Sequence, residues 1–106
     1  TEIYTLSLHD ALPIFEDLII DLSKKTCHID EQEIPLTKKE FEILILLLRH
    51  QNKILSREEI LNRVWSDDVI VLGRTIDVNI TRLRKKIGRY GKHIVTRLGY
   101  GYGFEV

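Results

Sequence analysis

The sequence predicts an α+β domain in which a small antiparallel sheet is followed by three helices and a C-terminal β-hairpin. Three observations predict this order. Short apolar segments separated by polar turns occupy the first part of the chain, two Ser/Thr-x-x-Glu motifs precede apolar helical patterns, and a glycine-rich turn lies near the C-terminus. The chain has 106 residues, 43% of them apolar, which is enough for one domain with one core.

Residues 1–14 are similar at every position to one reading frame of a common short-read sequencing adapter. We therefore expect this segment to be non-native and the native domain to span residues 15–106. The alternative is a native β-strand, because residues 3–8 show some alternation of apolar and polar side chains. On the adapter interpretation, a DNA fragment end determined where the native sequence begins, and an upstream domain is missing from this chain by accident.

Three strand-like segments follow at residues 18–20, 26–29 and 33–36. The polar turns at residues 24–25 and 30–32 separate them, which indicates an antiparallel sheet of three or four strands. Pro35 suits the end of a strand or an edge position, since proline cannot donate to a ladder of hydrogen bonds.

Two capping boxes predict where the first two helices begin. Thr37 with Glu40 opens a helix to about residue 50, which is apolar around most of its surface and is therefore expected at the centre of the core. Ser56 with Glu59 opens a shorter helix to about residue 65. A loop at residues 66–73 follows it.

A third helix is predicted at residues 74–87, where apolar residues at helical spacing form one narrow stripe: Ile76, Ile80, Leu83 and Ile87. A solvated surface helix usually mixes acids with bases. Here Asp77 is the one acid between Arg74 and Arg97, against eight Lys and Arg residues. The segment therefore indicates contact with nucleic acid, because a DNA groove needs cations for phosphates and short or forked side chains for base edges.

The distribution of charge supports this interpretation, although the formal net charge is zero. Residues 1–73 hold 8 basic and 14 acidic side chains, whereas residues 74–106 hold 8 basic and 2 acidic ones. The basic end is the expected electrostatic footprint of a nucleic-acid partner.

A β-hairpin is predicted after Gly88 and Gly91, which are expected to end the third helix. Its strands are residues 93–97 and 102–106, joined by a turn at residues 99–101. Two capped helices, a basic helix and a hairpin in this order predict a winged helix-turn-helix with an N-terminal antiparallel sheet, a three-helix core and a C-terminal β-hairpin wing.

With these elements in place, residues 15–106 resemble the OmpR/PhoB family of bacterial response-regulator DNA-binding domains. Four motifs in the right order carry the resemblance: PLTKKEFEIL at residues 35–44, LSREEILNRVW at 55–65, RTIDVNI with RLRK at 74–85, and GYGYGF at 99–104. The resemblance implies sequence-specific binding of double-stranded DNA as the output domain of a two-component system. It also implies a receiver domain upstream, a head-to-tail dimer on direct repeats and contact with RNA polymerase.

The resemblance also implies roles for individual residues. Base contacts are expected from Val78, by methyl contact with thymine, and from Arg82, by a fork to guanine. Phosphate contacts are expected from the polar side chains at matching positions: Arg74, Thr75, Asn79, Thr81, Arg84, Lys85 and Thr96. The wing residues expected at the minor groove are Arg97 and Tyr100, and the loop expected to contact polymerase includes Asp67, Asp68, Val69 and Ile70.

Several alternatives stay open at this point. Thr81 stands where the family often has Arg, and Leu98 stands where several members have Arg or Trp, so it is open whether Arg97 reaches the minor groove. Arg84 could pair with Asp77 instead of a phosphate, and Lys85 and Lys86 could contribute only diffuse charge. The domain could also be a protein-interaction module without specific DNA binding, or a fragment that binds DNA poorly.

Other classes of function are disfavoured. The four histidines have no partners at metal or catalytic-triad spacing, and no paired carboxylates lie in a catalytic frame, so we expect no enzyme, no metal and no cofactor. The longest strictly apolar run, residues 43–48, is too short to cross a membrane, and no secretory signal is recognisable. With the single cysteine Cys27, these features predict the cytoplasm.

Overall fold

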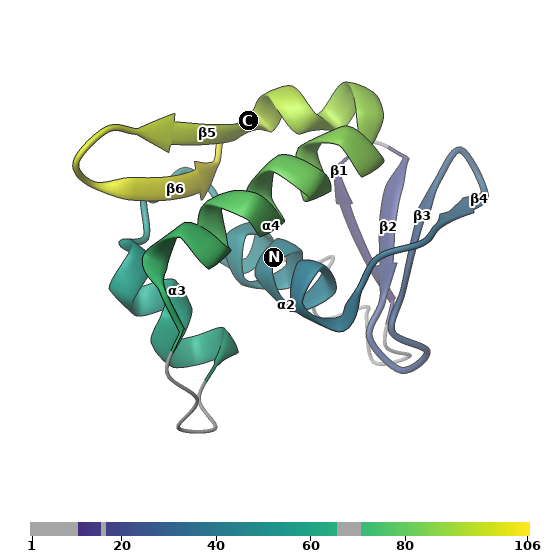
Figure 1. The fold of residues 1–106 in the computed structure, drawn as a ribbon. Coiled ribbons are helices and arrows are strands. Elements are labelled where there is room, and N and C mark those ends of the chain that lie inside the picture. Colours follow the sequence, from purple (N-terminus) through teal and green to yellow (C-terminus); the bar gives the residue numbers. More distant parts are fainter. Residues whose placement is uncertain (1–10, 16, 66–70) are drawn as a thin grey trace.

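The computed structural model describes residues 11–15, 17–65 and 71–106, the first of these ranges by its backbone alone. A four-stranded sheet lies on one side of the helices and a two-stranded hairpin on the other (Figure 1). The elements in order are β1 (Ala11–Phe15), β2 (Leu18–Asp21), β3 (Thr26–Ile29), β4 (Gln32–Ile34), α2 (Lys38–Arg49), α3 (Arg57–Val64), α4 (Gly73–Lys86), the 3₁₀ helix η2 (Gly88–His93), β5 (Ile94–Arg97) and β6 (Gly101–Phe104). The predicted α+β winged helix-turn-helix is confirmed.

The N-terminal sheet is antiparallel throughout, in the order β1-β2-β3-β4. Its side chains alternate as the period of a strand requires: Leu18 and Ile20 are buried, whereas Ile19 between them is exposed. β1 includes residues 11–14, so four residues of the segment predicted to be non-native form a strand, and the start of the native domain at residue 15 stays a prediction. Pairing of their backbone with β2 is sufficient to make them a strand, whatever the origin of their sequence.

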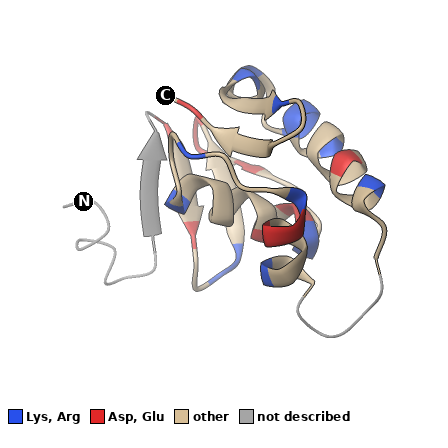
Figure 2. Cartoon of the chain, turned by 90° about the vertical axis from the view of Figure 1, so that its left-hand side faces the viewer, with Lys and Arg blue, Asp and Glu red and all other residues tan. Residues whose placement is uncertain are grey.

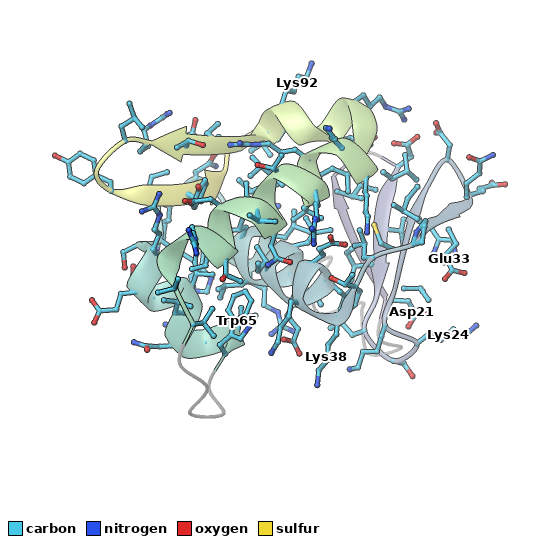
Figure 3. All side chains as sticks on the ribbon, viewed as in Figure 1. Asp21, Lys24, Glu33, Lys38, Trp65 and Lys92 are labelled. Atoms are coloured by element: carbon cyan, nitrogen blue, oxygen red, sulfur yellow. The ribbon has the colours of Figure 1, made fainter. Side chains whose placement is uncertain are left out.

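Both predicted capping boxes are confirmed. At the start of α2 the backbone N–H of Thr37 donates to Glu40 Oε1 at 2.9 Å, and the Thr37 side chain accepts from the Glu40 N–H. Ser56 and Glu59 make the same reciprocal pair at the start of α3. α2 forms the centre of the core, since Ile43, Leu44 and Leu47 are fully buried. Trp65 directly follows α3 (Figure 3). Its ring lies near the start of α2, with the ring centre 5.3 Å from Lys39 Nζ.

The sequence did not predict η2. Gly88 ends α4 as expected, with a positive φ of 57° that suits glycine. Gly91, in contrast, lies within η2, where an added Cβ would stand 2.5 Å from the Arg84 carbonyl oxygen. Gly91 therefore permits close packing of η2 on α4, and the helical turn places Tyr90 in the core with 2% of its surface exposed.

The hairpin is anchored to the segment between α2 and α3. Backbone hydrogen bonds join Leu55 and Tyr102 in both directions, at 2.8 and 2.9 Å. Glycines make this approach possible, because a Cβ on Gly101 or Gly103 would stand 1.9 Å from Leu55 O or 2.3 Å from Lys53 O. The wing therefore has a fixed position relative to the helices.

Candidate nucleic-acid interface

α4 has one buried face and one exposed face. Ile76, Ile80 and Leu83 have no exposed surface, so the core fixes the rotation of the helix about its axis. Five exposed residues recur at helical spacing on the opposite side and form a single stripe: Arg74, Val78, Thr81, Arg82 and Lys85. Lys86 is also exposed, but helical spacing places it on the flank of this stripe. Lys and Arg residues recur along the ribbon of α4 (Figure 2). We call this set of five residues the exposed stripe.

The cations of the exposed stripe are free within the described part of the chain. Arg74, Arg82 and Lys85 have no hydrogen bond or ion pair with any described residue, and Val78 between them is 45% exposed. Thr81 directs its hydroxyl to the Asp77 carbonyl oxygen at 2.9 Å. The stripe therefore offers three cations that no described residue pairs, around one small apolar side chain.

Arg84 lies on the flank of α4 that faces the wing. Its Nε donates to Ile94 O at 3.0 Å, and its Nη2 donates to Thr96 Oγ1 at 2.7 Å. The alternative that Arg84 pairs with Asp77 is wrong. Because the Thr96 hydroxyl and the Arg84 fork bind each other, both residues join α4 to β5 before any partner arrives.

Asp77 joins three elements. Arg57 of α3 donates to its two carboxylate oxygens from Nε at 3.1 Å and from Nη2 at 2.9 Å, and the Tyr102 hydroxyl of β6 donates to Oδ1. Burial raises the pKa of Tyr102, and the neighbouring Asp77 carboxylate raises it further. These contacts fix the start of α4 relative to α3 and the wing. The sequence indicated Arg84 as a partner for Asp77 and neither of these two, because Arg57 and Tyr102 are distant in the chain and no helical spacing relates them to it.

Lys86 also has a structural partner. Its Nζ lies 2.7 Å from Glu40 Oε1, and Glu40 is fully buried at the start of α2. Burial opposes ionisation of Glu40, but hydrogen bonds from Lys86 and Thr37 outweigh this effect and lower its pKa. Lys86 therefore compensates a buried carboxylate and is not part of the exposed stripe.

The remaining residues predicted to contact DNA or polymerase differ in how free they are to contact a partner. Asn79 Nδ2 donates to Thr75 O at 2.8 Å, on the flank of α4 away from Arg84. Arg97 Nη2 donates to both Glu105 carboxylate oxygens, at 3.0 and 2.9 Å, whereas Tyr100 at the tip of the wing is 76% exposed. Asp67, Asp68, Val69 and Ile70 lie outside the described residues.

Two further features of the described residues concern metal ions and membranes. No group of three or more His, Cys, Asp or Glu side chains among them could hold a metal ion. None of their helices combines the length and apolar character needed to cross a membrane.

Comparison with families and curated proteins identifies similar sequences. The family described as "Transcriptional regulatory protein, C terminal" matches residues 31–104. Response regulator protein GraR of Staphylococcus aureus (strain MRSA252) is 40% identical over 90 residues, which cover 83% of this chain and 40% of GraR. The chain thus matches less than half the length of this relative. Neither these similarities nor the fold supports an adapter origin for residues 1–14.

Solved structures resemble the fold closely. DrrB, a Thermotoga maritima OmpR/PhoB homologue, has a TM-score of 0.77 at 37% identity, over 87% of this chain and 43% of DrrB. The DNA-binding domain of the response regulator AdeR, solved in complex with an intercistronic region, has a TM-score of 0.75 at 27% identity, over 86% of this chain and 95% of that domain.

Proposed function

The chain belongs to the family of transcriptional regulatory protein C-terminal domains, of the OmpR/PhoB type, and from this premise we propose that it binds specific duplex DNA through the exposed stripe of α4. The family consists of DNA-binding output domains of two-component response regulators that control transcription. It is not a family of enzymes, which confirms the prediction that this chain is not one. The observation that carries the proposal is that Arg74, Arg82 and Lys85, around Val78, have no polar partner among the described residues.

The exposed stripe suits the major groove in both shape and charge. Val78 and Arg82 lie one helical turn apart, so both can reach base edges along one side of the helix. A guanidinium fork pairs with guanine O6 and N7, and a small apolar side chain fits beside a thymine methyl group. We assign base contact to Val78 and Arg82.

Phosphate contact is assigned to the polar residues around these two: Arg74, Lys85, Thr81, Thr75 and Asn79. The Thr81 hydroxyl and the Asn79 amide can exchange their internal backbone acceptors for phosphate oxygens. Arg84 and Thr96 receive a different role in this proposal, since they bind each other and hold the wing beside α4. They influence phosphate contact through the position of the wing.

The properties of the complete protein are also proposals, because this chain matches only 40% of the length of GraR. We propose an upstream receiver domain that controls pairing, head-to-tail binding of two domains on direct repeats, and RNA polymerase as a partner. Residues 66–73 are the proposed polymerase contact, and the cytoplasm is the proposed location.

The proposal is tested by selecting random-sequence duplex DNA with the purified chain and sequencing the retained molecules. We expect enrichment of a motif, in particular a direct repeat about 10–11 base pairs apart. Binding should also weaken steeply as salt rises, because phosphate contacts release counterions. A chain that binds no duplex at low salt would instead be a protein-interaction module.

A further inference from the structure

A groove of about 580 Å³ runs along one side of α2, and none of its described lining residues belongs to α4 or the wing. Four of the side chains that line it are apolar and pack on the core: Leu22, Leu36, Phe41 and Ile45. Phe41 is buried, and the other three are half-buried. A smaller groove of about 290 Å³ shares Ile45 with the first and continues it towards α3. This surface is therefore separate from the exposed stripe.

The rim of the larger groove is basic. Lys25, Lys38 and Arg49 line it, are exposed, and have no hydrogen bond or ion pair with any described residue. Glu42 also lines it, but Lys39 Nζ lies 3.6 Å from Glu42 Oε1, so a cation already compensates this carboxylate. The groove therefore combines an apolar surface with three cations that no described residue pairs. Such a surface favours a partner that is both apolar and anionic.

The groove also has the length of a short helix. Lys38 and Arg49 are the first and last residues of α2 and both line the groove, so it follows α2 for about 16 Å at 1.5 Å per residue. Three turns of a second helix have about the same length. The facing wall consists of Leu22 and Lys25, in the turn after β2, and of Leu36. Neither wall is a strand edge, so an extended peptide finds no ladder of backbone groups to pair with.

We propose that this groove binds an acidic amphipathic helix of a partner protein, which goes beyond DNA binding. The apolar face of the helix lies on Leu36 and Ile45, as in other complexes of a helix with a groove. Its acidic side chains pair with Lys38 and Arg49 at the two ends of α2, which fixes its position along the groove. Duplex DNA suits the groove less well, because phosphates gain nothing from the apolar lining. Since the exposed stripe stays free, one domain can bind DNA and the helix at the same time.

The probe for this site is a fluorescent synthetic peptide of about 14 residues, held helical by a side-chain crosslink, with leucines on one face and glutamates beside them. A second peptide has lysine at each glutamate position. Fluorescence anisotropy measures the affinities, and NMR shifts of the backbone amides locate the binding. We expect the acidic peptide to bind at least about tenfold more tightly and to shift amides of α2 and of the turn after β2. Equal affinities, or shifts confined to α4 and the wing, would overturn the proposal.

Lys38→Glu tests the basic rim. Lys38 extends outward from the start of α2 (Figure 3), where an acid suits the helix dipole, so this variant should keep its fold. It should bind the acidic peptide about fivefold less tightly and the basic peptide more tightly. Lys24→Glu is the matched control, because Lys24 is also exposed but does not line the groove. It should change affinity by less than about twofold. Equal losses in the two variants would show only long-range attraction and would overturn the proposal.

Ile45→Ala tests the apolar surface. The side chain of Ile45 is half-buried and alanine favours a helix, so the variant should remain folded, which thermal unfolding checks. It should weaken binding of the acidic peptide about fivefold, because the leucines of the peptide lose part of their apolar contact. Unchanged affinity would show that charge alone holds the peptide and would overturn the assignment of the groove.

Other occupants are distinguished by two further measurements. Saturation with the selected duplex should change the affinity for the acidic peptide by less than about twofold, because the two sites share no residue. Competition would overturn the proposal. A chain that is dimeric without the peptide, and that Lys38→Glu makes monomeric, would identify a second copy as the occupant and would also overturn it. If the chain binds no duplex but binds the acidic peptide in the groove, the proposed function fails and this proposal stands.

Discussion

Seven of the eight cations at residues 74–106 form two groups that differ in what they contact. Arg74, Arg82 and Lys85 lie on the exposed stripe and have no polar partner among the described residues. Others are held by the protein itself: Arg84 by Thr96 and Ile94, Lys86 by Glu40, Arg89 by Asp17 and Asp30, and Arg97 by Glu105. We refer to these two sets as the free and the held cations.

The difference shows that a basic segment contains two kinds of positive charge. Lys85 and Lys86 are neighbours with the same side chain, yet one faces solvent and the other compensates a buried carboxylate. A held cation stabilises the fold, since removing it leaves its partner unpaired. A free cation contributes nothing comparable to stability and is available to phosphates. Substitutions should therefore divide into those that change stability and those that change DNA binding.

The largest effect is expected for Lys86→Ala. Glu40 is fully buried, so its carboxylate would lose its charged partner, and the free energy of unfolding should fall by roughly 3 kcal/mol. Lys85→Ala is the matched control and should change stability by less than about 0.5 kcal/mol. Denaturant titration of both variants measures the difference. Equal stabilities would show that Lys86 is not held in solution.

The pair of Glu40 and Lys86 also predicts how the stability of the fold depends on pH. The pKa of Glu40 is lowered in the folded state below its ordinary value of 4.5, so its ionisation stabilises the fold at neutral pH. This contribution should disappear as the pH falls through the lowered value. Glu40→Gln should be less stable at neutral pH and should lose less stability on acidification. Urea titrations at a series of acidic pH values test this, and parallel curves for the two proteins would contradict it.

Arg82→Ala tests the free group. We expect a loss of roughly 1–3 kcal/mol in binding to the selected site and a relaxed preference at one base pair, with no change in stability. Arg82→Lys keeps the charge but loses the planar fork, so it should restore affinity without restoring the preference. Binding to a set of single-base variants of the site measures both effects. A uniform loss across all sites would make Arg82 a phosphate contact.

A smaller effect is expected for Asp77→Asn, the acid next to the exposed stripe. Its contacts with Arg57 and Tyr102 are partly exposed, so stability should fall by roughly 1 kcal/mol. Removing the negative charge of Asp77 favours binding to phosphates, whereas a shift of the start of α4 relative to the wing disfavours binding. Weaker binding would therefore identify Asp77 as a positioning residue, whereas tighter binding would mean that its charge merely repels phosphates.

The sequence predicted much of the fold because the signals involved are local. The capping boxes, the alternation in β2 and the apolar stripe of α4 each depend on residues within a few positions of one another. The turns of η2 were not predicted, because Gly91 was expected to end a helix. In the structure Gly91 lies within η2 and permits close packing of η2 on α4. β1 was excluded because of its resemblance to an adapter, although the backbone of residues 11–15 pairs with β2.

The exposed stripe could also be predicted, but the division of the cations could not. Helical spacing assigns Arg82 and Lys85 to the exposed face whatever surrounds the helix. The partners of Arg84, Lys86 and Arg97 come from β5, α2 and the C-terminal end, and no spacing along α4 specifies them. The proposed pairing of Arg84 with Asp77 was wrong for the same reason, because Arg57 from α3 binds that carboxylate.

The salt dependence of DNA binding by Lys85→Ala and Lys86→Ala tests the division most directly. If Lys85 is free and contacts a phosphate, Lys85→Ala should lower the slope of log affinity against log salt by about one. Lys86→Ala, measured where it is fully folded, should leave the slope unchanged because Glu40 holds that lysine. Equal reductions in slope for the two variants would contradict the division into free and held cations.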